Sequence, residues 1–375
     1  MMSRVTFFKL GVALACLSGL LGGCASDKPK PASLSPLVNA VQPQSVWQFR
    51  EGAARFIGWP AHRDGVMVIA DNKSQLQAVS VSTGQRLWQV ALGAPVEAGV
   101  GFDGRRAAAV IRGNVLVVVQ DNKVAWRSTL PARTVTPPVV AGDRVFVMTV
   151  NRVVHAFDGA DGAKLWTYDK PGDALTLAQP GVLSTWTNTL LVGQGPQLVG
   201  LDPNTGLGRW EVALANPRGS NEVERLADLV GPSARWGDMI CARAYQAAVS
   251  CVDARRGQLR WTRNTGGWNS VAVDAQRVVG ADASSRISAW SAVSGEILWS
   301  QEVLVHRELS APVLWGPYVA LGDLEGRVHL LQAESGTVVA RLTTDGSPIQ
   351  APPQVFGATL VVTTRSGGVF AFKLN

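Results

Sequence analysis

Cys241 and Cys251 are the residues whose types and spacing most directly predict a covalent bond in this 375-residue sequence. Two short hydrophobic runs, 238–243 and 248–252, contain them on either side of a turn at residue 246. This pattern predicts a β-hairpin in which the two thiols lie directly opposite each other. In an oxidising compartment such a pair forms a cross-strand disulfide. The alternative is that Cys251 packs as a free thiol, because other copies of the repeat described below have a small residue there.

Cys24 is the second site of predicted covalent chemistry. It follows two basic residues, an apolar run over residues 10–21 and two glycines. This order is typical of a secretory signal peptide, here over residues 1–23. The sequence Leu21-Gly22-Gly23-Cys24 also resembles the bacterial lipobox, in which the cysteine is acylated and becomes the first residue of the mature chain.

The residues after Cys24 predict how the acylated chain is used. Ala25, in place of an aspartate, implies by the same resemblance that the lipoprotein is sent to the outer membrane. Residues 24–43 are rich in Pro, Ser and Lys, a composition typical of an extended and mobile tether. We therefore expect one folded domain over residues 44–375, held near a membrane by its lipid.

Groups that catalyse reactions or bind metals are sparse in this sequence. The four histidines stand singly, without metal-ligand spacing: His62, His155, His306 and His329. No Gly-x-Ser-x-Gly elbow and no phosphate-binding loop occurs. Three aspartates recur at one position of a repeat and suit turn capping: Asp158, Asp202 and Asp253. The sequence therefore predicts no catalytic residue, no metal and no cofactor.

Composition limits the remaining classes of function. With 46% hydrophobic and 17% charged residues, the chain has enough apolar material for a large core and too much for a disordered protein. The net charge of +7 is not gathered into any Lys/Arg cluster, so we expect no nucleic-acid partner.

The elements that would position any site come from an internal repeat. A glycine followed four residues later by tryptophan recurs five times: Gly84/Trp88, Gly162/Trp166, Gly206/Trp210, Gly257/Trp261 and Gly295/Trp299. Degenerate copies stand at Asn122/Trp126 and Gly336/Ala340, and successive copies are 38 to 51 residues apart. Each copy contains β-branched and aromatic runs bounded by turn residues, which predict short strands. The glycine supplies a positive φ for a tight turn, and the tryptophan can wedge between neighbouring sheets.

Four antiparallel strands in each copy of about forty residues predict one blade of a β-propeller. The last copy ends at Asn375 without its glycine and tryptophan, whereas the folded N-terminus begins with Val46-Trp47. If the first strand completes the last blade, the ring closes with eight blades and no free sheet edge. Seven blades would result if the copy at Asn122 formed no blade of its own.

The pattern hydrophobic-x-Ala-x-Asp-x-x-Thr-Gly-x-x-x-Trp, seen over residues 155–166 and 198–210, resembles the PQQ-like propeller repeat. With the lipobox and no cytochrome domain, the chain resembles the BamB family within it. That resemblance implies a non-catalytic scaffold lipoprotein of the outer-membrane β-barrel assembly (BAM) complex. Its implied partners are the periplasmic POTRA domains of BamA, the other BAM subunits and unfolded outer-membrane protein clients.

The resemblance also implies which residues bind the partner. Leu175 and Leu177 would be apolar contacts, and Arg225 and Asp228 polar contacts on a long inserted loop. Burial inside the loop is the alternative role of the two leucines, and a local ion pair that of Arg225 and Asp228. Ala178 and Val230 depart from the family, which tends to have Arg and Asp there.

The alternative from another class of function is a PQQ-dependent dehydrogenase or a PQQ-binding envelope protein. Such an enzyme needs a calcium site, a carboxylate base and a stacking platform for the quinone. The sequence shows no recognisable set of these groups and lacks the adjacent cysteine pair of related enzymes.

Overall fold

The computed structural model describes residues 29–37, 40–50, 58–71, 73–172, 175–217 and 219–374. The predicted signal peptide and Cys24 lie outside these residues. No helix among the described residues has the length and hydropathy needed to cross a bilayer.

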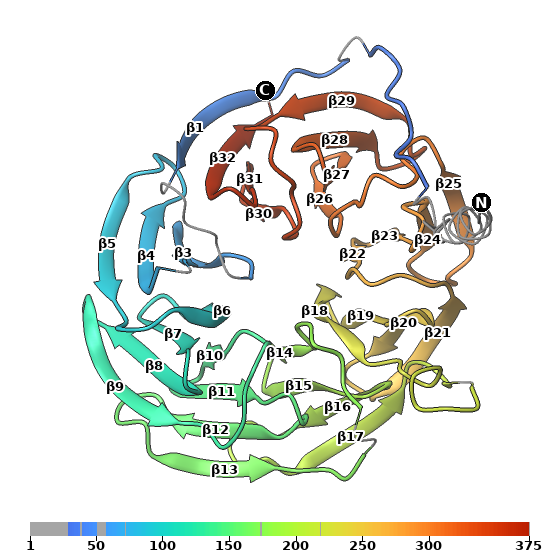
Figure 1. Cartoon of the computed structure of the whole chain (residues 1–375). Coiled ribbons are helices and arrows are strands. Elements are labelled where there is room, and N and C mark those ends of the chain that lie inside the picture. The colour runs from blue at the N-terminus through green and yellow to red at the C-terminus, as the bar shows by residue number, and fades with distance from the viewer. Residues whose placement is uncertain are drawn as a thin grey trace, which may run out of the picture. The chain divides into compact units, whose positions relative to one another are not determined.

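The described residues from Ala32 onward form eight four-stranded antiparallel sheets arranged as the blades of a propeller (Figure 1). Blades 1 to 4 are β2 (Ala61–Arg63), β3 (Val66–Ala70), β4 (Gln75–Ser80), β5 (Arg86–Ala91); β6 (Val96–Phe102), β7 (Arg106–Ile111), β8 (Val115–Gln120), β9 (Lys123–Thr129); β10 (Val139–Ala141), β11 (Arg144–Met148), β12 (Val154–Asp158), β13 (Lys164–Tyr168); and β14 (Leu183–Trp186), β15 (Thr189–Gln194), β16 (Gln197–Leu201), β17 (Gly208–Ala213).

Blades 5 to 8 continue the same order of strands from the axis outward. They are β18 (Leu229–Trp236), β19 (Met239–Ala244), β20 (Ala248–Asp253), β21 (Gln258–Asn264); β22 (Ala272–Val273), β23 (Arg277–Ala281), β24 (Ile287–Ser291), β25 (Ile297–Gln301); β26 (Val313–Trp315), β27 (Tyr318–Gly322), β28 (Arg327–Gln332), β29 (Val338–Thr343); and β30 (Gln354–Phe356), β31 (Thr359–Thr363), β32 (Gly368–Lys373) with β1 (Gln44–Arg50).

Closure of the ring is as predicted. β1 pairs antiparallel with β32, with Trp47 opposite Ala371, so the N-terminal strand is the outermost strand of the C-terminal blade. The copy at Asn122 forms blade 2, because Asn122 adopts a φ of 59° in the turn between β8 and β9. The eight-bladed prediction is confirmed, and the seven-bladed alternative is wrong.

Neighbouring blades are joined by the two residues that define the repeat. The indole N–H of Trp126 donates to the carbonyl of Gly159 in the next blade at 3.0 Å. A Cβ built on Gly162 would stand only 2.6 Å from Cε3 of the same ring, and its φ is +77°. Glycine is therefore required twice over, by the turn and by the close approach of the preceding blade's tryptophan.

Apolar side chains from facing sheets fill the space between blades. One cluster combines Val68 and Leu76 of blade 1 with Ala109 and Val117 of blade 2, all of them buried. The core is thus a ring of layers between blades, as expected for sheets that each bury both faces.

The segment predicted as a tether is in contact with the ring from Ala32 onward. The backbone N–H of Ala32 donates to the carbonyl of Val305 at 3.0 Å, and that of Ala40 to Val339 at 2.8 Å. Leu34 packs against the apolar cluster between blades 6 and 7. The folded unit therefore begins at Ala32, earlier than the predicted residue 44.

A buried polar cluster holds this N-terminal segment. Arg307 donates to the carbonyl of Ala32 at 2.9 Å and to the carboxylate of Asp323 at 2.8 Å. Asp323 is also 2.9 Å from Nε2 of His329, and all three side chains are nearly inaccessible. Burial opposes ionisation of Asp323, but the hydrogen bonds from His329 and the backbone of Arg327 prevail and hold its pKa at about 2.

Cys241 and Cys251 lie directly opposite each other on β19 and β20. They are joined in a disulfide with Cα atoms 4.1 Å apart, and both residues are fully buried. The connecting turn contains Gln246 with a φ of 51°, at the position where the hairpin was predicted to reverse.

Candidate functional site

Two long connections form the part of the ring that carries the predicted partner contacts. Residues 169–182 join β13 to β14, and residues 214–228 join β17 to β18. Each leads from the outermost strand of one blade to the innermost strand of the next, so both lie on the same face of the ring (Figure 1).

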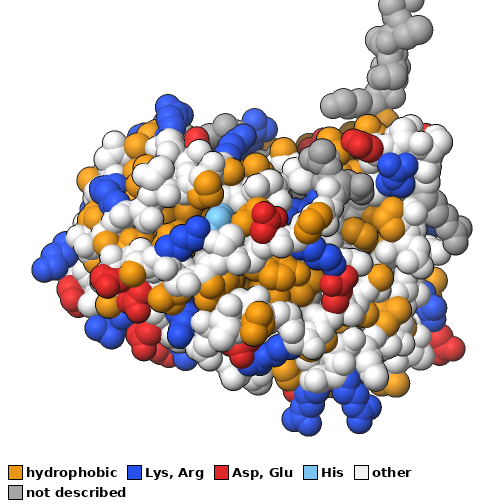
Figure 2. Space-filling view, turned by 90° about the horizontal axis from the view of Figure 1, so that it is seen from below, with side chains coloured by type: hydrophobic (Ala, Val, Ile, Leu, Met, Phe, Trp, Pro, Cys, Tyr) orange, Lys and Arg blue, Asp and Glu red, His pale blue; other side chains and the backbone are white. Residues whose placement is uncertain are grey.

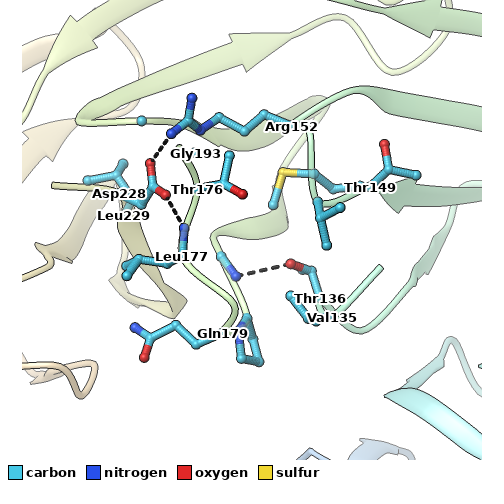
Figure 3. A pocket seen from close by; sticks show the side chains of 15 residues that line it. Val135, Thr136, Thr149, Arg152, Thr176, Leu177, Gln179, Gly193, Asp228 and Leu229 are labelled. Atoms are coloured by element: carbon cyan, nitrogen blue, oxygen red, sulfur yellow. Dashed lines mark hydrogen bonds and ion pairs between the residues drawn. The ribbon is translucent and has the colours of Figure 1, made fainter. Parts of the chain in front are cut away.

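Asp228 joins these two connections through its carboxylate. Oδ1 accepts a hydrogen bond from Nη2 of Arg152 at 2.7 Å, and Oδ2 accepts one from the backbone N–H of Leu177 at 2.8 Å (Figure 3). Nη2 of Arg152 also donates to the carbonyl of Leu175 at 2.9 Å. Because the side chains of Arg152 and Asp228 are only 15% and 14% exposed, they act as an internal clasp on the loop that carries both leucines.

Arg152 is a residue of this candidate site that the sequence did not indicate. It lies in the turn between β11 and β12 with a φ of 64°, which is uncommon for a residue other than glycine. Gln194 fixes the same turn, because its side-chain amide donates to the carbonyl of Arg152 at 2.7 Å. The same turn recurs in other blades, where Ser74, Ser285 and Gly326 also stand ten residues before the repeat glycine with a positive φ. The repeat therefore marks the position of Arg152, but not that its side chain reaches Asp228.

Leu175 and Leu177 are both half-buried in this arrangement. They are therefore neither fully buried inside the loop nor fully exposed, and part of each side chain remains accessible to a partner. Figure 3 shows Leu177 beside the Arg152–Asp228 pair, in a small cavity of about 40 Å³ that Thr136 also lines.

Arg225 lies in the inserted loop and is half-buried. Together with Leu175, Asp228, Lys170 and Glu222, it lines a cavity of about 320 Å³. The structure thus brings Leu175, Arg225 and Asp228 to one place, with charged groups of both signs around an apolar side chain. We call the set Arg152, Leu175, Leu177, Arg225 and Asp228 the rim site.

A local turn shapes the inserted loop beside Arg225. The backbone N–H of Ser220 donates to the carboxylate of Glu224 at 2.7 Å, and the backbone N–H of Glu224 donates to Oδ1 of Asn221 at 2.9 Å. The hydrogen bonds from Ser220 hold the pKa of Glu224 below its usual value.

The two departures from the family pattern have different surroundings. Ala178 is exposed beside Leu177, so the surface there lacks a charge. Val230 is only 4% exposed and forms an antiparallel bridge with Gly181, where an unpaired carboxylate would be costly.

The mouth of the central channel offers a second place for a ligand. A cavity of about 320 Å³ lies among the inner ends of the blades, and Trp59, Gln179, Trp268 and Gln350 line it. No residue that lines this cavity has a carboxylate, so its donor set does not fit the calcium and carboxylate base of a quinoprotein dehydrogenase. Within the described ranges, no group of three or more His, Cys, Asp or Glu could hold a metal ion.

The recurring aspartates occupy turns and do not converge on a common site. Oδ1 of Asp158 accepts the backbone N–H of Ala160 at 2.8 Å, and Oδ1 of Asp202 accepts that of Asn204 at 2.7 Å. On the side of the ring shown in Figure 2, acidic and basic side chains are interspersed without a continuous patch of one sign.

Comparisons with known proteins agree with the fold. A family model described as "Outer membrane protein assembly factor BamB" matches residues 72–301. The assembly factor BamB of Burkholderia pseudomallei is 34% identical, covering 96% of this chain and 97% of that protein. BamB of Bordetella pertussis is 30% identical with 96% of each covered, and BamB of Escherichia coli is 28% identical with 94% and 95% covered.

Solved structures show the same architecture. The crystal structure of BamB from Moraxella catarrhalis superposes with a TM-score of 0.79 at 22% identity, over 89% of this chain and all of that one. The quinohemoprotein alcohol dehydrogenase of Comamonas testosteroni reaches 0.67 at 15% identity, over 91% and 78%, which is a likeness of fold alone. On the family model and the curated relatives, the chain belongs to the BamB family of outer membrane protein assembly factors.

Proposed function

We propose that this protein is a non-catalytic scaffold of the β-barrel assembly complex, and that its rim site binds the periplasmic POTRA domains of a BamA partner. The observation that supports this most is the clasp between Arg152 and Asp228. It fixes the backbone of a loop whose two leucines keep part of their surface accessible, which lowers the ordering cost when a partner docks.

The composition of the rim site suits a protein partner better than a small molecule. Leu175 offers apolar area at the centre, while Lys170, Glu222 and Arg225 offer charges around the same cavity. An apolar centre with a polar rim is the usual anatomy of a protein interface. Arg225 is the candidate anchor among the polar residues, because arginine is enriched where interface energy is concentrated.

Two further parts of the proposal concern location and clients. Lipidation at Cys24 would hold the protein at the periplasmic side of the outer membrane, with the other BAM subunits. The outer strands of blades 1 and 3 present Leu87 and Leu165, which are 52% and 43% exposed. Such strand edges could guide extended client segments by β-augmentation, which photo-crosslinkers at residues 87 and 165 would detect.

The deciding experiment is capture of partners from solubilised envelopes with a variant carrying Leu175→Asp and Leu177→Asp. We expect the BamA partner to be lost, because two charges would replace the apolar centre of the site. The control carries Leu87→Asp, which changes a leucine of 52% exposure in blade 1, a blade that contributes no residue to the rim site. Equal recovery of the partner by both variants would show that the rim assignment is wrong.

The enzymatic alternative has its own test. PQQ and Ca²⁺ would be added to the purified protein, followed by dye-linked oxidation of alcohols. We expect no dye reduction above a blank, since the channel mouth lacks carboxylates among its lining residues. Dye reduction that depends on both additions would contradict the proposal of a scaffold.

A further inference from the structure

Blade 6 has an uncovered stripe of apolar side chains along its outer edge. Val293, Ile297, Leu298 and Val303 are 79%, 66%, 52% and 52% exposed. They follow one another along the turn before β25, β25 itself and the turn after it, the outermost part of that blade (Figure 1). We call these four residues the blade 6 stripe.

The repeat shows that this stripe is not a general property of the blades. Two residues before the repeat glycine, the equivalents of Val293 are Ser82, Ala160, Asn204, Arg255 and Glu334. At the two positions equivalent to Ile297 and Leu298, the pairs are Arg86/Leu87, Lys164/Leu165, Gly208/Arg209, Leu259/Arg260 and Val338/Val339. Only blades 6 and 7, among these copies, have large apolar residues at both.

In blade 7, the equivalent apolar pair, Val338 and Val339, lies under another part of the chain. Val339 is 7% exposed and belongs to the apolar cluster of blades 7 and 8, against which Val41 of the N-terminal segment packs. Ala40 also donates its backbone N–H to the Val339 carbonyl at 2.8 Å. The segment, blue in Figure 1, covers the outer edge of blade 7 and reaches blade 6 at Val305. It leaves Ile297 and Leu298 uncovered, so a different occupant is needed there.

The chain upstream of Ala32 indicates that occupant. Seven residues separate Cys24 from Ala32, so an extended chain places the predicted lipid within about 29 Å of Ala32. Ala32 is bonded to Val305, two residues from Val303 at one end of the stripe. These seven residues contain no large apolar side chain that could cover the stripe. They include two lysines and one aspartate, and their net charge of +1 favours anionic headgroups.

We propose that the blade 6 stripe rests on the lipid surface into which the acyl chains of Cys24 insert, so that the anchor and the stripe together orient the propeller. This inference depends on the proposed lipidation. Glu302, which flanks the stripe, is paired with Arg286 at 2.9 Å and so adds no unpaired charge beside Val303. Glu296 lies at the other end and accepts a hydrogen bond from Ser294 at 3.1 Å.

The test uses single cysteines labelled with an environment-sensitive fluorophore. Once the signal peptide is removed and Cys24 is acylated, Cys241 and Cys251 are joined in the disulfide, so Leu298→Cys introduces one reactive thiol. Leu87→Cys is the matched control, because Leu87 has the same repeat position and the same 52% exposure but lies in blade 1. Full-length lipidated protein is bound to vesicles of phosphatidylethanolamine with a minority of phosphatidylglycerol, with and without brominated acyl chains.

We expect the label at residue 298 to shift its emission to the blue and to be quenched by brominated lipid, while the label at residue 87 does neither. Ile297→Cys provides a second reporter should labelling at residue 298 disturb the blade. Vesicle flotation with equal responses at residues 298 and 87 would overturn this inference alone. Failure of the unlabelled protein to float with vesicles would overturn the lipid anchor and this inference together.

Discussion

The clasp at the rim site predicts a measurable loosening when Asp228 is replaced by alanine. The carboxylate of Asp228 accepts the backbone N–H of Leu177 at 2.8 Å and a hydrogen bond from Arg152 at 2.7 Å. In Asp228→Ala both donors lose this acceptor, and the backbone between Leu175 and Leu177 is no longer fixed to the inserted loop.

The size of the effect follows from the strength of one charge-assisted hydrogen bond. Such a bond contributes about 1.5–3 kcal/mol when it is largely shielded from water, as it is for Asp228 at 14% side-chain exposure. Local opening at Leu177 should therefore become about 10- to 150-fold more frequent, since each 1.4 kcal/mol corresponds to a factor of roughly ten.

Amide hydrogen exchange at Leu177 measures this opening directly. The control is Asp202→Ala in the same blade region, where Asp202 caps a different turn and accepts a bond from Arg209. We expect faster exchange at Leu177 in Asp228→Ala and unchanged exchange in the control. If Asp228 acted only by touching the partner, exchange at Leu177 in the free protein would stay the same, and the clasp would be refuted.

Three further predictions concern the ring. Gly162→Ala should lower the free energy of unfolding by about 2–4 kcal/mol, because the new Cβ would meet a tryptophan ring at a residue with positive φ. The control, Gly142→Ala, also has a positive φ but has open space around the Cβ, so it should lower the free energy of unfolding by only about 1 kcal/mol. Urea denaturation measures both values. Replacing Cys241 and Cys251 by serine should lower the free energy of unfolding by about 2–3 kcal/mol, as expected for the short loop that this disulfide closes. A reducing agent should have the same effect on the wild-type protein. Burial lowers the pKa of His329 below its ordinary 6.5, so just below pH 6.5 the unfolded chain binds a proton that the folded chain does not. The free energy of unfolding should therefore fall as the pH drops below about 6.5. In unfolding measured across pH, His329→Gln should flatten this dependence.

The architecture could be predicted from the sequence because each blade is a local unit. Gly162 and Trp166 mark the turn and the outer strand of the same blade, and their spacing recurs around the ring. The sequence does not say, however, that Gly162 faces Trp126 of the preceding blade. That contact follows only once the blades are stacked.

The rim site was predictable only in part. The resemblance to the family identified Leu175 and Asp228, but not that Asp228 lies inside a clasp. Its partner Arg152 is 76 residues away in sequence. The turn that contains Arg152 recurs in other blades, but Ser74, Ser285 and Gly326 occupy its position there, so the repeat does not indicate a long cationic side chain that reaches another blade. The predicted start of the folded domain at residue 44 was too late, because the average composition of the segment hides Leu34 and Val41, which pack against the ring.

Ring closure also determines where the N-terminal segment meets the ring relative to the rim site. β1 is fixed as the outer strand of blade 8, so the segment before it must run back across blade 7 to blade 6, where Ala32 binds Val305. The rim site lies on the connections between blades 3, 4 and 5. Because intervening blades are packed through buried layers, the ring acts as a rigid spacer between the edge that holds Ala32 and the proposed partner-binding face. A scaffold of this kind needs its two attachment points at a fixed separation, whereas an enzyme of the same fold would need convergent side chains at the axis.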